Sequence, residues 1–189
     1  MEGCAFSMTT MEERVDDPIR SETPLSVTPR VTPFNQRAYR DALGNFGTGV
    51  TIITATGSEG PVGMTVNSFA SVSLDPALVL WSLAKSSGRF APFAEAQNYA
   101  IHVLCADQQD LASAFARNGN AFHACDWVLN GHGVPQIKGA IARFDCTRNA
   151  VHDAGDHLII VGQVENFVHR QSEPLIFAKG SFGGFRRND

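Results

Sequence analysis

The sequence predicts a mainly β protein whose short strands form a closed or nearly closed antiparallel barrel with a few flanking helices. Three observations indicate this fold class. Short runs of β-branched and apolar residues recur along the chain, and turn residues such as Gly57-Ser-Glu-Gly60 separate them. Seventeen glycines favour a turn-rich fold over a helical bundle. No regular alternation of strands with helices occurs, so a parallel sheet is not expected.

The length of 189 residues suits one domain and a tail. Residues 1–31 place three prolines among Ser, Thr and charged residues, a composition that buries little apolar surface. We therefore expect a disordered N-terminal tail over residues 1–31 and a folded domain over residues 32–189. With 43% hydrophobic and 18% charged residues, the chain can bury a sizeable core.

Local patterns predict the elements of this domain in order. Thr32-Pro33 is typical of a helix start, and apolar residues follow at helical spacing as far as Phe46. Shorter helices are expected near 90–96 and 107–115, and 118–136 reads as irregular. Residues 151–157 should connect the last long antiparallel pair. The expected strands are 50–56, two runs within 62–83 joined at Asp75-Pro76, 99–105, 140–150, 158–168 and 175–178.

The stretch from Val62 to Leu83 has an unusual composition for a pair of strands. Asp75 is its only formal charge, yet its first run is dense in short hydrogen-bonding side chains: Thr65, Asn67, Ser68, Ser71 and Ser73. Short hydroxyls and amides let a ligand approach the backbone, and they need partners when buried. We therefore expect this stretch to face a polar, uncharged and flat ligand.

Two further motifs could contact a ligand. Lys85-Ser86-Ser87-Gly88-Arg89 lies between a strand and a short helix, where free N–H groups, hydroxyls and cations could hold a phosphate; the alternative is a solvated turn. Gly155-Asp156-His157 stands at the head of a strand. Its aspartate could orient the imidazole toward a substrate, or the three residues could form a tight turn and nothing more.

Several function classes are not expected. A net charge of -4 without clustered Lys and Arg gives no footprint for nucleic acid. No GxGxxG motif stands between a strand and a helix, and His123-Ala-Cys125 has no second pair to complete a metal site, so we expect no bound metal. The scattered cysteines suggest reduced thiols. No signal peptide and no apolar run of about 20 residues occurs, which predicts a cytoplasmic protein without a membrane partner.

Four segments together resemble the small NAD(P)H:flavin oxidoreductases that serve two-component monooxygenases. They are Arg40-Asp-Ala-Leu-Gly44, Gly49-Val-Thr-Ile-Ile-Thr54, Gly63-Met-Thr-Val-Asn-Ser-Phe-Ala-Ser-Val-Ser-Leu-Asp-Pro76 and Gly155-Asp-His157. They occur in the order seen in that family, and the resemblance covers roughly residues 34–180. The third segment is the most specific of the four.

The resemblance implies an FMN-binding split barrel, a Greek-key antiparallel barrel with flanking helices, which forms a homodimer with flavin near the interface. It also implies roles for individual residues. Thr65, Val66, Asn67 and Ser68 would line the isoalloxazine and ribityl chain, with Ser71 close by, and Lys85, Ser86 and Ser87 would meet the phosphate. His157 would lie where nicotinamide docks, and Phe182 would close that side, although Lys179-Gly-Ser-Phe-Gly-Gly is less basic and aromatic than the usual ending.

The resulting hypothesis is that a nicotinamide dinucleotide reduces FAD or FMN, with NADH expected as the donor in preference to NADPH. The reduced flavin then diffuses to a partner monooxygenase. Such hydride chemistry belongs to the cofactors, so no strong acid or nucleophile is needed. One rival is a flavin-binding protein on the same barrel without reductase activity. A second is an oxidase of the pyridoxamine-phosphate type, which would need arginines that converge on a substrate phosphate. The sequence leaves FAD and FMN as alternatives.

Overall fold

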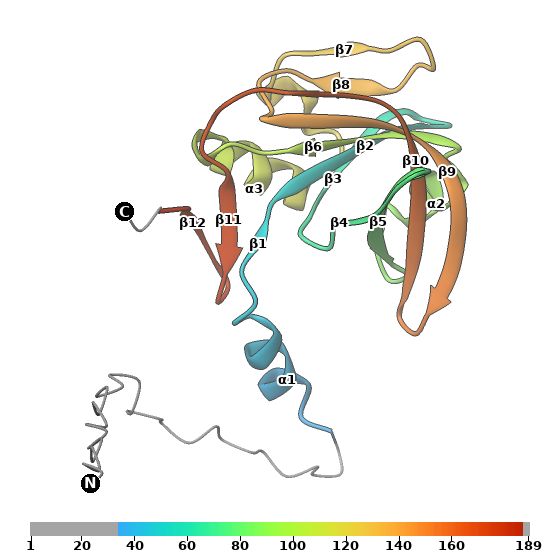
Figure 1. Ribbon diagram of the computed structural model, residues 1–189. Coiled ribbons are helices and arrows are strands. Elements are labelled where there is room, and N and C mark those ends of the chain that lie inside the picture. Colours follow the sequence, from blue (N-terminus) through green and yellow to red (C-terminus); the bar gives the residue numbers. More distant parts are fainter. Residues whose placement is uncertain (1–33, 187–189) are drawn as a thin grey trace, which may run out of the picture. The chain divides into compact units, whose positions relative to one another are not determined.

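The computed structural model describes residues 34–186, so the tail predicted for residues 1–31 lies outside the described residues. The chain divides into two units, residues 1–36 and residues 37–189. Of the first unit, only residues 34–36 are described, and the last of them, Gln36, is the first residue of helix α1. The second unit consists mostly of antiparallel strands (Figure 1), as the sequence predicts.

The elements follow one another with short connections. The helices are α1 (Gln36–Leu43), α2 (Phe90–Glu95) and α3 (Gln109–Arg117), with 3-10 turns at Ala106–Gln108 and Ala121–Ala124. The strands are β1 (Thr48–Gly49), β2 (Thr51–Gly57), β3 (Gly60–Val66), β4 (Ala70–Leu74), β5 (Ala77–Ala84), β6 (Asn98–Val103), β7 (Trp127–Leu129), β8 (Pro135–Ile137), β9 (Ala142–Ala154), β10 (His157–His169), β11 (Leu175–Ala178) and β12 (Ser181–Gly184).

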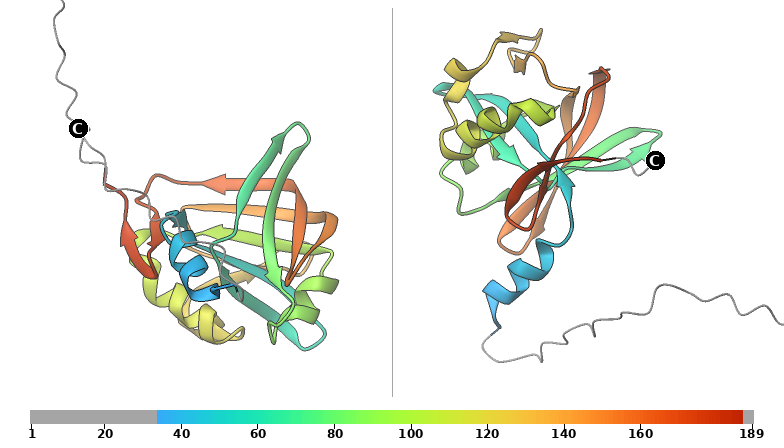
Figure 2. Two further views of the ribbon diagram at one scale, coloured as in Figure 1. Left: turned by 90° about the horizontal axis from the view of Figure 1, so that it is seen from below. Right: turned by 90° about the vertical axis from the view of Figure 1, so that its left-hand side faces the viewer.

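Seven of these strands form one curled antiparallel sheet in the order β3-β2-β6-β9-β10-β5-β4, which Figure 2 shows from two further directions. Its two edge strands, β3 and β4, are consecutive in the chain and are joined by residues 67–69. No ladder joins these edges, so the barrel is nearly closed and is open along one seam. Strands β1, β11 and β12 form a second, three-stranded sheet.

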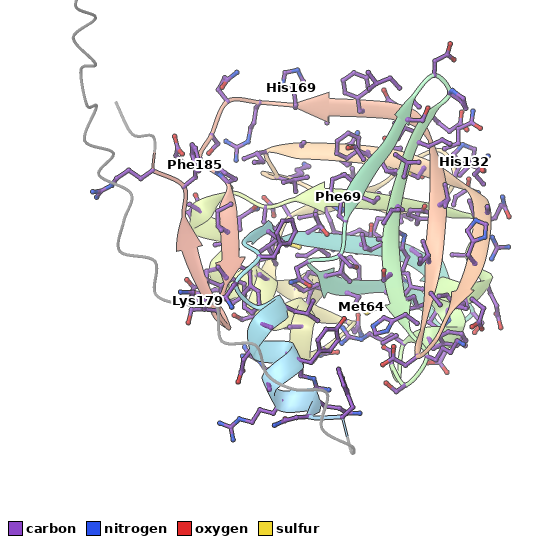
Figure 3. The ribbon with its side chains drawn as sticks, turned by 60° about the horizontal axis from the view of Figure 1, so that its bottom comes forward. Met64, Phe69, His132, His169, Lys179 and Phe185 are labelled. Carbon is purple, nitrogen blue, oxygen red and sulfur yellow. The ribbon has the colours of Figure 1, made fainter. Side chains whose placement is uncertain are left out.

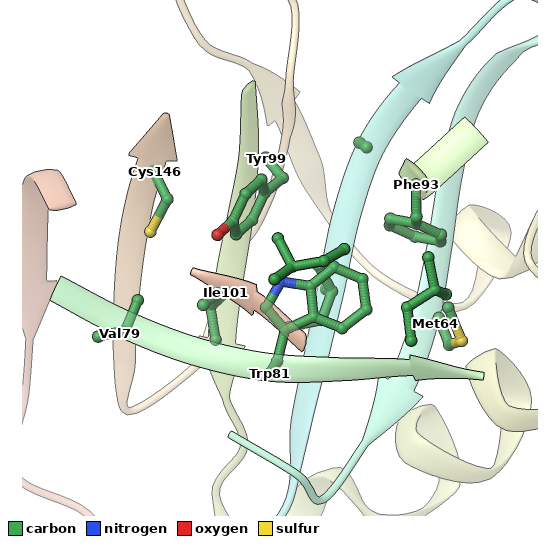
Figure 4. Close-up of a cluster of buried hydrophobic side chains, with 11 residues drawn as sticks. Met64, Val79, Trp81, Phe93, Tyr99, Ile101 and Cys146 are labelled. Atoms are coloured by element: carbon green, nitrogen blue, oxygen red, sulfur yellow. The ribbon is translucent and has the colours of Figure 1, made fainter. Parts of the chain in front are cut away.

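Strand β2 is buried on both faces and separates two hydrophobic clusters. Because side chains alternate along a strand, Ile53 and Ala55 face one cluster and Ile52 faces the other. Figure 4 shows the first cluster, where the buried Trp81 of β5 meets Phe93 of α2 edge to face, with 5.6 Å between the ring centroids. The second cluster joins β2 to α3, β8 and β11.

Helix α3 lies directly against β3, and a glycine makes this approach possible. A Cβ atom on Gly63 would overlap the fully buried ring of Phe115. The backbone of Gly63 also donates a 2.8 Å hydrogen bond to the carbonyl of Gly119, just beyond the helix. The first residue of the most specific sequence segment is therefore required by packing.

Three expectations about local structure need correction. The connection expected over residues 151–157 is a turn of two residues, Gly155 and Asp156, because polar residues continue the exposed strands to that point. The segment expected to be irregular, 118–136, contains β7 and the start of β8. Helix α1 is present, but it begins at Gln36 and none of its residues is buried, so Leu43 and, beyond the helix, Phe46 remain exposed.

Candidate functional site

The hydroxyl-rich segment lies at the seam of the barrel. Thr65 and Val66 end β3, Asn67 and Ser68 begin the connection between the two edge strands, and Ser71 lies in β4. A seam between edges leaves backbone N–H and C=O groups without sheet partners, and such groups can bind a ligand. The structure therefore places all five predicted residues along the seam between the two edge strands.

Two hydroxyl groups of this segment bind the protein itself. Thr65 Oγ1 donates a hydrogen bond of 2.6 Å to the carbonyl of Ala112 in α3. Ser68 Oγ accepts from the backbone N–H of Ser82 at 2.9 Å and donates to its carbonyl at 3.3 Å. These bonds fix the connection to α3 and to β5. Composition could not distinguish such positioning hydroxyls from ligand-facing ones.

Asn67 faces a small pocket instead. Its side chain is exposed and makes no hydrogen bond within residues 34–186. The pocket has a volume of about 200 Å³, and its lining residues come from three separate parts of the chain: Arg40, Leu43, Gly44, Phe46, Asn67 and Phe177. No local sequence pattern predicts that α1 and β11 meet at Asn67, because that meeting depends on tertiary packing.

The turn after β5 is tied to the β9–β10 hairpin through Lys85. Its ammonium lies 2.5 Å from Asp153 Oδ2 and 2.7 Å from the carbonyl of Gly155. Its backbone N–H donates to the carbonyl of Asp156 at 2.9 Å. An ammonium has three N–H donors, so one remains for a ligand.

Ser87 and Arg89 organise the same turn, and only the serine belongs to the predicted site. Ser87 Oγ accepts a 3.2 Å hydrogen bond from the N–H of Arg89. The guanidinium of Arg89 donates to the carbonyls of Phe115 at 2.5 Å and Ala116 at 2.9 Å, and its pKa is lowered by burial. Arg89 therefore caps the C-terminal end of α3 and is not free to hold a phosphate. Ser86 is exposed beside it.

His157 begins β10 directly opposite Ala84, the last residue of β5. Its Nδ1 lies 2.7 Å from Asp156 Oδ1, and its side chain is 40% exposed. This hydrogen bond lowers the pKa of the Asp156 carboxyl, and the charge of His157 and the more distant charge of Arg40 act in the same direction. The ionised carboxylate can only accept, so Nδ1 is the donor in this bond, and Nε2 makes no hydrogen bond to another residue of the described range.

Phe182 lies in the three-stranded sheet, half-buried against Phe177 with 5.3 Å between the ring centroids. Phe177 in turn lines the pocket beside Asn67. The structure thus connects Phe182 to the hydroxyl-rich segment through Phe177, and no ring contact or hydrogen bond joins Phe182 to His157 among the described residues. Its role at the nicotinamide side stays a prediction.

The site suits a positioned, flat and hydrogen-bonding ligand. Asn67, Ser71 and Ser86 offer side-chain donors and acceptors that no other described residue uses. Among residues 34–186, no group of three or more His, Cys, Asp or Glu side chains could hold a metal ion. No helix of the described part is long and apolar enough to cross a membrane. The residues present fit a flavin, whose flat isoalloxazine ring carries a ribityl chain that ends in a phosphate.

Comparison with known proteins agrees with this geometry. Residues 43–186 match the family described as "Flavin reductase like domain". The chain is 61% identical over 153 residues to the FMN reductase (NADH) SmoA of Agrobacterium fabrum, covering 81% of this chain and 88% of that protein. It is 45% identical over 148 residues to the reductase component of the flavin-dependent trigonelline monooxygenase of Acinetobacter baylyi. That match covers 77% of this chain but only 48% of the longer relative.

A solved structure shares the fold. The NADH:FAD oxidoreductase SgcE6 of Streptomyces globisporus C-1027, in complex with NAD and FAD fragments, superposes with a TM-score of 0.75 at 37% identity. The match covers 80% of this chain and 93% of that one. The split-barrel architecture expected from the sequence is therefore confirmed.

Proposed function

The chain belongs to the flavin reductase-like family, and from this premise we propose that it transfers a hydride from NADH to FMN or FAD. The observation that carries the proposal is the pairing of His157 with Ala84. This pairing brings an imidazole, oriented by Asp156, beside the Lys85 turn that adjoins the seam. An enzyme of this type needs two flat ligands held in contact and little chemistry from its own side chains.

For the flavin, we assign the seam residues to two tasks. Asn67 and Ser71 offer side chains to the pyrimidine edge and the ribityl chain, whereas Thr65, Val66 and Ser68 hold the backbone that lines the ring. Thr65 and Ser68 do so through α3 and β5. Backbone N–H groups fixed in this way favour the negative charge that develops on a flavin as it accepts a hydride.

The phosphate end of the flavin is assigned to Lys85, Ser86 and Ser87. Asp153 orients the lysine ammonium, so its remaining N–H is directed before the ligand arrives. A loop that is ordered in advance loses less conformational entropy on binding. The nicotinamide side is assigned to His157 and Phe182. The Nε2 atom of His157 is left to hydrogen-bond the nicotinamide carboxamide, while the phenyl ring excludes water.

Exposed apolar residues on edge strand β4 support a homodimer. Leu74 is 95% exposed and Val72 is 48% exposed on this strand. An exposed apolar edge strand is a liability in a monomer and is usually covered. We propose that a second copy of the chain covers it, next to the seam.

The reduced flavin supplies a flavin-dependent monooxygenase, as the relatives' names indicate for those proteins. The flavin site at the seam is open, so a reduced ligand can leave by diffusion. The cytoplasmic location expected from the sequence remains a prediction.

Steady-state oxidation of NADH by the purified chain, with FMN or FAD added, tests the proposal. We expect turnover that depends on the flavin. Flavin binding without NADH oxidation would favour the rival, a flavin-binding protein without reductase activity. The pyridoxamine-phosphate rival loses support, because Arg89, the arginine of the proposed phosphate loop, is bound to α3.

A further inference from the structure

A second pocket adjoins the small pocket that contains Asn67, and it lies between α1 and the turn that joins β11 to β12. Its volume is about 580 Å³, and its lining residues are Arg40, Asp41, Gly44, Asn45, Phe177, Lys179 and Gly180. Two of these side chains are cationic and one is acidic, which leaves one positive charge in excess. The pocket therefore favours an anionic group beside an aromatic surface.

The backbone holds the two cations at this pocket. The N–H of Lys179 donates a 2.7 Å hydrogen bond to the carbonyl of Gly44, just beyond the end of α1. Lys179 itself has a φ of 50°, a conformation that non-glycine residues adopt rarely. Figure 3 shows its side chain in the turn beside α1. Neither Arg40 nor Lys179 forms an ion pair with another residue of the described range.

Arg40 connects this pocket to both halves of the proposed site. It also lines the small pocket that contains Asn67, with Gly44 and Phe177 common to both pockets. Its charge also helps to lower the pKa of Asp156, after the hydrogen bond and charge of His157. Arg40 thus lies close to the seam and also within electrostatic reach of the histidine proposed to meet nicotinamide.

The turn after β5 lacks the free charge to hold more than one phosphate. The ammonium of Lys85 already has an acidic partner, and the guanidinium of Arg89 is bound to α3. A dinucleotide that brings nicotinamide to His157 must place its diphosphate, with two negative charges, near unpaired cations. Arginine suits this task because its planar fork binds two phosphate oxygens at once.

We propose that Arg40 and Lys179 form a subsite for the diphosphate of the nicotinamide dinucleotide. The proposal rests on the proposed reductase function and adds the residues that select a dinucleotide as the hydride donor. Phe177 supplies an apolar surface in the same pocket.

Steady-state kinetics with two hydride donors and two acceptors tests the subsite. The donors are NADH and the phosphate-free 1-benzyl-1,4-dihydronicotinamide; the acceptors are FMN and phosphate-free riboflavin. We expect Arg40→Ala to raise the KM for NADH about tenfold or more with either acceptor. Its activity with the benzyl donor should equal that of the wild type. Lys179→Asn, which removes the charge but tolerates a positive φ, should act in the same direction.

Arg37→Ala is the matched control, because Arg37 is an exposed arginine of the same helix that lines neither pocket. It should leave the KM for NADH unchanged. Direct binding of ADP-ribose, measured by calorimetry without flavin, should weaken in Arg40→Ala and not in Arg37→Ala. Arg40→Lys should restore part of the affinity.

Three results would overturn the subsite. An equal loss of activity in Arg40→Ala with NADH and with the benzyl donor would mean that Arg40 supports the fold. A loss of activity in Arg40→Ala that occurs with FMN but not with riboflavin as the acceptor would assign Arg40 to the flavin phosphate. Unchanged kinetics and ADP-ribose binding would leave Arg40 without this role. In each case the wild-type chain still oxidises NADH with flavin, whereas failure of the wild type would reject the proposed function itself.

Discussion

The ammonium of Lys85 lies 2.5 Å from a carboxylate oxygen of Asp153, which ties the turn after β5 to the β9–β10 hairpin. Hydrogen bonding and the charge of Lys85 lower the pKa of the Asp153 carboxyl, so the contact persists at neutral pH. Both side chains are partly or largely exposed, and exposed ion pairs contribute little to stability. We therefore infer that the ion pair serves to orient the Lys85 ammonium and not to stabilise the fold.

The substitution Lys85→Met tests this orientation role. We expect the KM for FMN to rise about three- to tenfold, because one charge-assisted hydrogen bond to the phosphate is lost. The KM for riboflavin and the melting temperature should stay near the wild-type values. Lys138→Met, at an exposed lysine beyond β8, is the control. An equal rise for both flavins would show that Lys85 acts through the fold of the turn.

The substitution His157→Ala should impair hydride transfer more than flavin binding. Stopped-flow reduction of bound flavin is expected to slow about tenfold, because the nicotinamide is held less well, while the Kd for flavin changes little. His152→Ala, on the exposed face of the same hairpin, should leave both quantities unchanged. Equal loss of both in His157→Ala would indicate a structural histidine.

The barrel was predictable because its strands are marked by β-branched runs and its turns by glycine and proline. The hydroxyl-rich composition of residues 65–73 predicted a stretch that faces a ligand, but not that this stretch lies at the seam between β3 and β4. The use of those hydroxyls was not predictable, since Thr65 and Ser68 bind Ala112 and Ser82, which lie far from them in sequence. Local composition does not record such partners.

The elements that sequence patterns missed are short or rich in glycine. Strands β7 and β8 have three residues each, and β12 reads Ser-Phe-Gly-Gly. Their pairing comes from neighbours in space and not from local propensity. For the same reason, the approach of Arg40 to Asn67 could not be predicted from the chain.

Because His102 is buried, we expect the free energy of unfolding to decrease at acidic pH. Its Nε2 accepts from the N–H of Ile137 and its Nδ1 donates to the carbonyl of Ile52, both at 3.0 Å, so the ring must be neutral. Burial is the main cause that lowers its pKa from 6.5 to about 4. Between these values only the unfolded chain takes up the proton. The stability present above pH 6.5 is thus lost as the pH falls, by about 3 kcal/mol near pH 4.

Urea unfolding of the wild type and of His102→Gln between pH 4 and pH 7 measures this contribution. The variant should be less stable at pH 7, because the flexible amide of glutamine replaces a buried, rigid ring that holds both hydrogen bonds in place, and its stability should depend less on pH. Parallel pH dependence in the two proteins would contradict the assignment. Nearby Arg143 and Asp145 influence the same ring in opposite directions, so they are kept unchanged.

The substitution Gly63→Ala should destabilise the protein by about 1–3 kcal/mol, because the added Cβ overlaps the buried ring of Phe115. Gly183→Ala is the control, since a Cβ at that strand position meets no atom within 4 Å. The free energy of unfolding in urea compares the two. Equal stability of both variants would show that α3 can move away from β3 without cost.

The exposed side chain of Leu74 provides the test of the homodimer. If a second copy covers strand β4, burial of Leu74 at the interface contributes apolar stabilisation that Leu74→Lys removes. Sedimentation equilibrium should then find a dimer for the wild type and a monomer for the variant. Leu129→Lys, at an exposed leucine on β7, should remain dimeric. A monomeric wild type would disprove the homodimer, and a dimeric Leu74→Lys would place the interface away from β4.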